Sequence, residues 1–115
     1  MVAMKKVYAR FYEASTGAKP VRDWLLALPR EDRRTIGSDV QAVEFGWPIG
    51  MPLCRSLGRG LWEVRSNIAV GRIARVIFCF AGSGIVLLHG FVKKSQRTPE
   101  SELALAMKRM KEVQQ

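Results

Sequence analysis

Cations dominate one stretch of this chain. Between positions 55 and 97 there are eight basic side chains and a single acid, Glu63. The eight are Arg55, Arg59, Arg65, Arg72, Arg75, Lys93, Lys94 and Arg97. The flanks are balanced, because residues 1–54 carry eight basic and six acidic side chains and residues 98–115 carry three of each. This distribution predicts that the middle segment binds an anionic partner: a nucleic acid, an acidic protein or another anionic surface.

Groups suited to proton transfer or to metal binding are scarce in the same segment. His89, the single histidine, could be a general base near neutral pH, but its apolar neighbours favour a hydrogen-bonded residue of a sheet. No pair of acids is present that could hold a divalent ion. Cys54 and Cys79 are too far apart for a metal-ligand motif, so we expect two buried thiols. The sequence thus predicts neither a metal nor a cofactor.

Periodicity predicts the elements that position these cations. Residues 6–12 alternate as a strand does, and residues 21–28 and 31–45 have apolar side chains at helical spacing, with Pro29 between them. These two helices are expected to form a helical hairpin. Three strands are then predicted at residues 61–66, 72–80 and 85–92.

A last helix is expected after Thr98-Pro99-Glu100, with the Thr98 hydroxyl as its cap. The fold class is therefore α+β, with a small twisted antiparallel sheet, an N-terminal helical hairpin and a C-terminal helix. We expect the helices to cover one face of the sheet and the other face to meet a ligand. Residues 76–80 are apolar at both odd and even positions, so both faces of this strand should be covered, which indicates a central strand. Arg75, one residue before this run, should lie at the rim of the covered region. Glu63 and Arg65 are two residues apart and so share one face of their strand, which can point outward.

Length and composition bound the remaining possibilities. The 115 residues suit a single domain, 1–115, and 48% hydrophobic with 25% charged residues is typical of a globular protein. No apolar run is long enough to span a membrane, and the N-terminus does not resemble a signal peptide. We therefore expect a cytoplasmic protein with no membrane partner.

Several segments together resemble a known superfamily. The runs LWEVR (61–65), GRIARVIFCF (71–80) and IVLLHGFVKKSQRTPESELALA (85–106), with LLALP in the helical hairpin, are similar in order and spacing to the phage-derived HigB-like branch of the RelE/ParE toxins. The resemblance covers nearly the whole chain and implies a RelE-like fold.

The resemblance also implies a function: the toxin of a type II toxin–antitoxin system that enters the ribosomal A site and cuts the mRNA there. In such enzymes the ribose 2′-hydroxyl attacks the adjacent phosphate without a metal. The implied partners are the ribosome with its mRNA and a cognate antitoxin, expected to be a helix-turn-helix DNA-binding protein.

Residue roles follow from the matched motifs. Arg75 is expected at the scissile phosphate, Lys94 at the leaving group, and Arg65 with Lys93 along the mRNA backbone. Further contacts to RNA are expected from three arginines of the basic segment: Arg59, Arg72 and Arg97. Glu63 stands where RelE has a lysine, and the terminal helix has no tyrosine, so the general base stays open.

Other interpretations remain at this stage. ParE shares the fold but inhibits DNA gyrase, and a prophage relic could keep the fold while only binding nucleic acid or an antitoxin. Trp62 and Phe91 could stack on bases, although core packing is the more common role of such residues.

Overall fold

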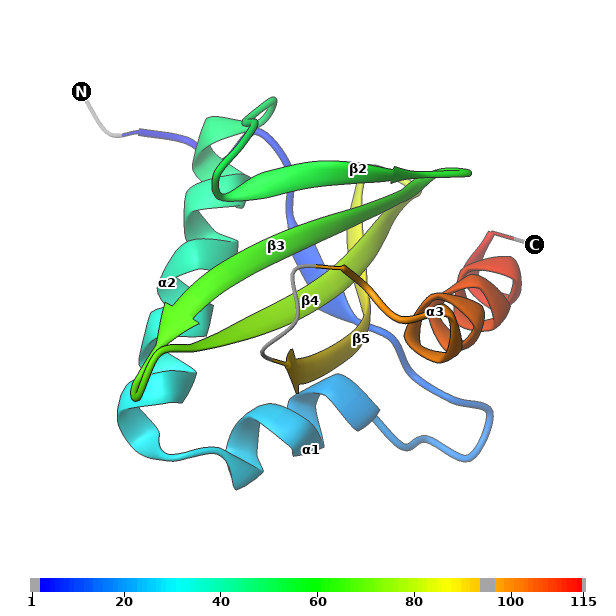
Figure 1. The fold of residues 1–115 in the computed structure, drawn as a ribbon. Coiled ribbons are helices and arrows are strands. Elements are labelled where there is room, and N and C mark those ends of the chain that lie inside the picture. Colours follow the sequence, from blue (N-terminus) through cyan, green and yellow to red (C-terminus); the bar gives the residue numbers. More distant parts are fainter. Residues whose placement is uncertain (1–2, 94–96, 115) are drawn as a thin grey trace.

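The computed structural model describes residues 3–93 and 97–114 and shows an α+β fold around one five-stranded sheet (Figure 1). The elements in chain order are β1 (Ala9–Phe11), α1 (Pro20–Ala27), α2 (Arg30–Gly46), β2 (Cys54–Gly58), β3 (Leu61–Ile68), β4 (Arg72–Ala81), β5 (Gly84–Lys93) and α3 (Glu100–Val113). The predicted fold class and helices are confirmed, with boundaries that differ by a residue or two.

The sheet is mixed and not purely antiparallel as predicted. Its order is β1-β5-β4-β3-β2, with β4 in the centre, and β1 runs parallel to β5. Strand β2 was missed because its five residues carry little alternation, and its pairing with β3 supplies what the local sequence does not. Strand β4 is buried on both faces from Ala74 to Cys79, so the prediction of a central strand is confirmed.

Two glycines permit close approaches to β5. A Cβ on Gly84 would lie 2.2 Å from the carbonyl oxygen of Tyr8, which follows from the pairing of β1 with β5. A Cβ on Gly90 would lie 2.4 Å from the ring of Trp24. Helix α1 can therefore pack directly on β5.

Helices cover both faces of the sheet, contrary to the prediction that they share one. Helices α1 and α2 lie on one face, where Ile36, Val40 and Val43 of α2 join the larger core cluster. They meet at a steep angle in Figure 1, so the expected hairpin is an open one: α1 packs on β5 and α2 on β3. Helix α3 lies over one end of the opposite face, where Ala106 and Met110 are buried in a second cluster. In the described part of the chain no helix is long and apolar enough to cross a membrane.

Candidate nucleic-acid interface

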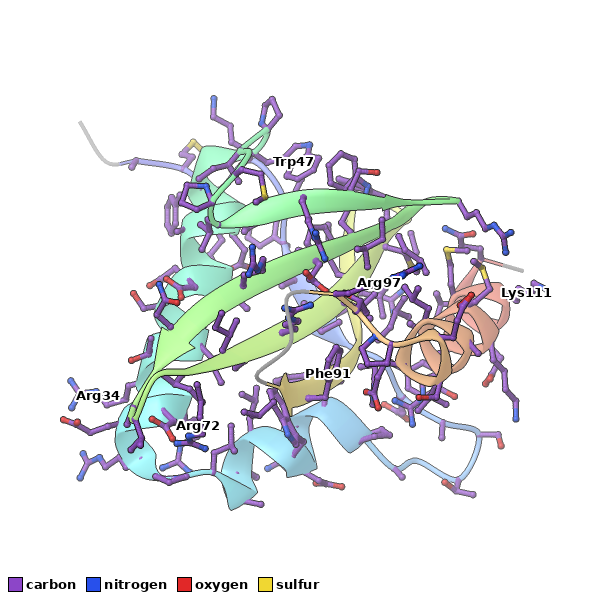
Figure 2. All side chains as sticks on the ribbon, viewed as in Figure 1. Arg34, Trp47, Arg72, Phe91, Arg97 and Lys111 are labelled. Atoms are coloured by element: carbon purple, nitrogen blue, oxygen red, sulfur yellow. The ribbon has the colours of Figure 1, made fainter. Side chains whose placement is uncertain are left out.

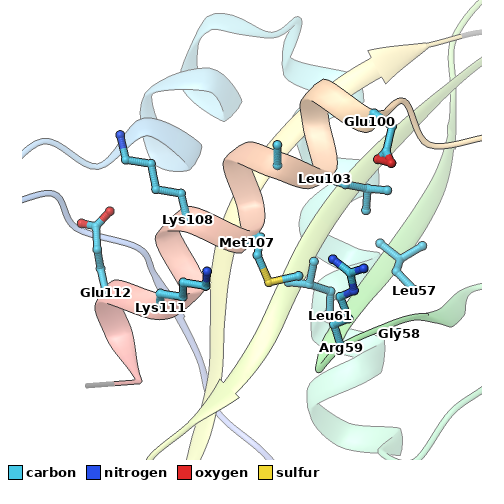
Figure 3. Close-up of a pocket in the computed structure, with 11 residues that line it drawn as sticks. Leu57, Gly58, Arg59, Leu61, Glu100, Leu103, Met107, Lys108, Lys111 and Glu112 are labelled. Carbon is cyan, nitrogen blue, oxygen red and sulfur yellow. The ribbon is translucent and has the colours of Figure 1, made fainter.

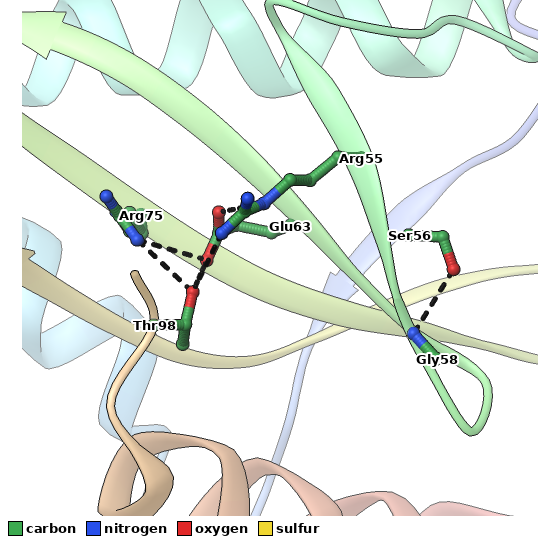
Figure 4. A network of polar contacts seen from close by, with 6 residues as sticks. All are labelled: Arg55, Ser56, Gly58, Glu63, Arg75 and Thr98. Carbon is green, nitrogen blue, oxygen red and sulfur yellow. Dashed lines mark hydrogen bonds and ion pairs between the residues drawn. The ribbon is translucent and has the colours of Figure 1, made fainter. Parts of the chain in front are cut away.

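Strand alternation brings cations together on the sheet face that carries α3. Arg55 pairs with Glu63 across β2 and β3, and Arg65 pairs with Arg75 across β3 and β4. Residues that pair across neighbouring strands point to the same face of the sheet. The four side chains therefore form two adjacent cross-strand rows on one face, one with Arg55 and Glu63 and the other with Arg65 and Arg75. Helix α3 lies at the other end of this face, and Thr98, just before α3, lies over the rows (Figures 1 and 4).

Glu63 is the centre of a buried polar network. Its Oε1 accepts a hydrogen bond from Arg55 Nε at 3.1 Å, and its Oε2 accepts one from the Thr98 hydroxyl at 2.5 Å (Figure 4). Oε2 also lies 3.9 Å from an Arg75 guanidinium nitrogen. The Thr98 oxygen in turn accepts hydrogen bonds from Arg75 at 3.2 Å and from Arg55 at 3.3 Å. Thr98 thus uses its single donor and both lone pairs, which ties the start of α3 to the sheet.

We call Arg55, Glu63, Arg65, Arg75 and Thr98 the Glu63 cluster. Three arginines against one glutamate leave it a formal charge of +2. The side chains of Glu63 and Arg75 are fully buried. Burial lowers the pKa of the Arg75 guanidinium; Glu63 acts to raise it, and Arg65 and Arg55 lower it further. An arginine nonetheless stays charged in a protein, so the cluster keeps excess positive charge in a partly desolvated place.

Arg65 has hydrogen-bonding capacity that the described residues do not use. Its side chain is half-buried, and its Nε is buried without a hydrogen-bond partner among the described residues. It also stands directly opposite Arg75, a like-charge pair that costs free energy unless an anion lies nearby. A buried donor without a partner carries a desolvation penalty. The arrangement is therefore suited to receive an anion such as a phosphate.

The structure corrects three local predictions about this cluster. Arg75 lies fully buried and not at a rim, because the Thr98 segment covers it. Glu63 faces into the network and not outward to solvent. Thr98 does not cap α3, since Pro99 occupies the cap position and the hydroxyl is engaged with the cluster.

Two of the other predicted RNA-binding residues, Arg72 and Arg59, lie outside the cluster. Arg72 donates to Asp32 of α2 at 2.7 Å and to the carbonyl of Ala69 (Figure 2). Arg59 is exposed in the turn between β2 and β3, and Arg97 is exposed just before Thr98. The backbone of Lys93 ends β5 opposite Ile73. Lys94 lies outside the described residues.

The sequence did not predict that Arg55 and Thr98 belong to the polar network around Glu63. Arg55 was counted only as one cation among eight, and Thr98 was interpreted as a helix cap. One signal was available in the sequence, because Glu63 is the sole acid in a basic stretch. A carboxylate that is buried in a strand needs cationic partners to offset its desolvation. Its particular partners depend on the strand register and could not be named in advance.

The remaining candidates take structural roles. The His89 ring bonds to the Glu102 carboxylate and stacks on Phe91, with ring centroids 5.6 Å apart, which confirms a hydrogen-bonded sheet residue. Trp62 packs edge-on against Trp47 at 4.9 Å, and Phe91 is buried, so core packing is confirmed for both. Cys54 and Cys79 are buried free thiols, as predicted. Across residues 3–93 and 97–114, no three His, Cys, Asp or Glu side chains are grouped as metal ligands would be.

Comparison with known proteins gives one family. The model of the phage-derived Gp49-like proteins (DUF891) matches residues 23–111, which include α2, most of α1 and α3, and every member of the Glu63 cluster. No curated protein matches the chain significantly. The match covers well over half of the sequence, and the α+β fold agrees with it. The chain therefore belongs to the Gp49-like family of phage-derived proteins, within the RelE/HigB-like toxin–antitoxin superfamily.

Proposed function

We propose that this protein is the toxin of a type II toxin–antitoxin system and a ribosome-dependent mRNA interferase. The observation that carries the proposal is the Glu63 cluster, in which Arg65 presents an unused buried donor beside a second, fully buried arginine. Family membership supports a toxin–antitoxin role, and the cluster supports an RNA phosphate as its ligand.

The proposed reaction is attack of a ribose 2′-hydroxyl on the adjacent phosphate. The oxygen–phosphorus bond to the 2′-oxygen forms as the bond to the 5′-oxygen breaks, through a dianionic phosphorane. The 2′-hydroxyl proton must leave, and the 5′-oxygen must gain a proton. Fixed cations lower the barrier because they stabilise the extra charge on the phosphorane more than the charge on the substrate.

Each cation of the proposed site has a distinct part. Arg65 makes the direct phosphate contact, because its side chain is only half-buried, whereas that of Arg75 is fully buried. Arg75 is held by Thr98 beneath the surface, so in this conformation it is a positioning residue whose charge acts through a medium of low polarity. We propose Lys94 for the leaving group and Lys93, the last residue of β5, for the RNA backbone.

Dependence on the ribosome follows from the scarcity of proton-transfer groups. Within the described residues the single histidine is bound to Glu102, and the acid of the basic segment is occupied by Arg55 and Thr98. Lysine and arginine side chains have ordinary pKa values well above neutrality. We therefore propose that the ribosome aligns the codon for in-line attack, an orientation effect that can supply several kcal/mol.

The test uses one transcript in two forms at equal protein concentration: free in solution, and on a stalled ribosome with an empty A site. Mapping of new 5′ ends should show cleavage on the ribosome and little cleavage of the free RNA. The Arg65→Ala variant should cut the ribosome-bound transcript on the order of a hundredfold more slowly, whereas the matched variant Arg34→Ala, on the exposed surface of α2, should cut as the wild type does. Equal cleavage of both forms contradicts ribosome dependence. Cleavage of neither, with DNA gyrase inhibited instead, would replace the proposal by a ParE-like function.

A further inference from the structure

Asp32 is a buried acid that the proposed cleavage chemistry does not use. It lies in the first turn of α2, on the face that also buries Ile36, and only 2% of its surface is exposed. Its Oδ2 accepts a hydrogen bond from Arg72 Nη2 at 2.7 Å, and its Oδ1 accepts one from the backbone N–H of Ala69 at 3.3 Å. Burial of a carboxylate is unfavourable without such partners, so the partners indicate what Asp32 holds in place.

Asp32 and Arg72 together bind both backbone polar groups of Ala69, in the turn between β3 and β4. The N–H of Ala69 donates to Asp32, and its carbonyl oxygen accepts a hydrogen bond from Arg72 Nε at 3.0 Å. Arg72 is also the first residue of β4, where it pairs with Ile68 at the end of β3 (Figure 2). We call Asp32, Ala69 and Arg72 the turn clamp. It joins the end of the β3–β4 hairpin to α2.

The β3–β4 turn has a backbone conformation that its own residues do not favour. Val70 has a φ of 62°, in the left-handed region, and it is 89% exposed, so packing does not offset the strain of a β-branched residue there. Glycine or asparagine is the usual residue at such a position. The β2–β3 turn, at the other end of β3, has a glycine on each side of Arg59. Arg59 lines a groove beside α3 and forms no ion pair among the described residues (Figure 3). Unlike that turn, the β3–β4 turn is held by a helix.

The position of Arg65 depends on this end of the hairpin. The pairing of β2 with β3 ends at Val64, so from Arg65 onward β3 is paired with β4 alone among the described strands. Arg65 stands opposite Arg75, and the pairs from there to the turn clamp follow without a register shift. A slip of one residue would move Arg65 to the other face of the sheet. A clamp at the end of the hairpin therefore restricts how Arg65 lies beside Arg75 in the Glu63 cluster.

We propose that Asp32 and Arg72 are positioning residues for RNA cleavage, which hold Arg65 and Arg75 at the spacing that the scissile phosphate requires. The inference rests on the proposed function, in which Arg65 contacts that phosphate. It replaces the prediction that Arg72 itself binds RNA. The Asp32 carboxylate, 2.7 Å from Arg72, offsets the guanidinium charge and would repel a phosphate, so Arg72 is a poor electrostatic contact for RNA.

The first experiment compares Asp32→Asn with Glu31→Gln in single-turnover cleavage of a transcript on ribosomes. Both variants remove one negative charge from the first turn of α2, but the Glu31 side chain is exposed. Asp32→Asn should lower the maximal rate per folded molecule at least about tenfold, because a small displacement of a catalytic contact is costly. The ribosome concentration at half-maximal rate should change by less than about twofold, and Glu31→Gln should cut as the wild type does. A merely structural role would lower only the folded fraction, which circular dichroism measures.

Substitutions of Arg72 separate positioning from RNA contact. Arg72→Lys keeps the charge but lacks the planar fork that bonds to Asp32 and to the Ala69 carbonyl together, so it should recover only part of the rate that Arg72→Ala loses. Neither variant should change the salt dependence of ribosome affinity, whereas loss of a phosphate contact would reduce that slope by about 1. A reduced slope in Arg72→Ala, or a fully active Asp32→Asn protein, would overturn the proposal.

Hydrogen exchange of the free protein tests the turn clamp without any cleavage. In Asp32→Asn the amides of residues 65–68 and 72–75 should exchange about tenfold faster, while those of residues 85–92 stay unchanged, because the opening is confined to the end of the hairpin. If the wild type cuts no RNA, the proposed function fails, and exchange still shows whether Asp32 holds the strands that carry Arg65 and Arg75. Unchanged exchange in Asp32→Asn overturns the inference whether or not the wild type cuts RNA.

Discussion

Glu63 Oε2 lies 3.9 Å from the Arg75 guanidinium, and neither side chain is exposed to solvent. A buried ion pair adds little net stability when it is intact, because desolvation offsets most of the attraction. Loss of one partner is different, since it leaves a buried charge uncompensated. We therefore expect the pair to fix the relative position of β3 and β4 and, through Thr98, of the segment that leads into α3.

Removal of the Glu63 carboxylate should strongly destabilise the fold. Glu63→Ala removes the carboxylate beside the buried Arg75 and leaves Arg75 close to Arg65 and Arg55, so we expect a loss of about 3–5 kcal/mol in the free energy of unfolding. Urea denaturation measures it. Glu13→Ala, which removes an exposed carboxylate 3.9 Å from Lys19, should change stability by less than about 0.5 kcal/mol. Similar losses for the two variants would contradict the central place of Glu63.

The Thr98 hydroxyl should contribute more to the free energy of unfolding than the Thr98 methyl group does. Thr98→Val keeps the shape but removes the donor to Glu63 and the acceptor for Arg75, and should cost about 1–3 kcal/mol in the free energy of unfolding. Thr98→Ser keeps the hydroxyl and should recover most of that loss. Hydrogen exchange should show faster opening of the first turn of α3 in the valine variant alone. If serine and valine behave alike, the hydroxyl does not hold the segment.

Arg65 should be required for cleavage but not for folding. Arg65→Ala should lower the cleavage rate on ribosomes on the order of a hundredfold, because it removes the donor that we place on the phosphate. Its melting temperature should stay close to that of the wild type or rise, since the like-charge contact with Arg75 is relieved. Arg65→Lys should give an intermediate rate, because lysine keeps the charge but not the planar fork. A fully active Arg65→Ala protein would remove Arg65 from the site.

The two thiols should be inert in the folded protein and should set an alkaline limit to stability. Burial raises the pKa of Cys54 and of Cys79 to about 11 from 9.0. The folded state thus favours the protonated thiols, and this preference costs nothing below pH 9. As pH rises from about 9 to about 11, the unfolded state loses these protons first, so the free energy of unfolding should fall over that interval.

Urea denaturation between pH 8 and pH 11 measures the effect, and Cys79→Ala should weaken the pH dependence. Alkylation at pH 8 gives a second readout, since about one thiol in a thousand is ionised in the folded state. Rapid alkylation of the native protein at pH 8 would show that the thiols are accessible.

The sequence alone determined the features that depend on near neighbours. Alternation located β3, β4 and β5, apolar spacing located the three helices, and the run of apolar residues in β4 identified the central strand. The excess of cations between positions 55 and 97 is likewise a property of the sequence. Each of these follows from the geometry of a single strand or helix, in which side chains two, three or four residues apart share a face.

Only the tertiary structure decided which distant groups meet. Glu63 and Thr98 are 35 positions apart, and their contact depends on the register of β3 and on the path into α3. Local periodicity is the same whether α3 packs on the face of α2 or on the opposite face, and it does not record that β1 joins β5 in parallel. The predicted rim position of Arg75 was wrong for the same reason: burial of a strand residue depends on what crosses above it, and here that is a segment 23 residues later in the chain.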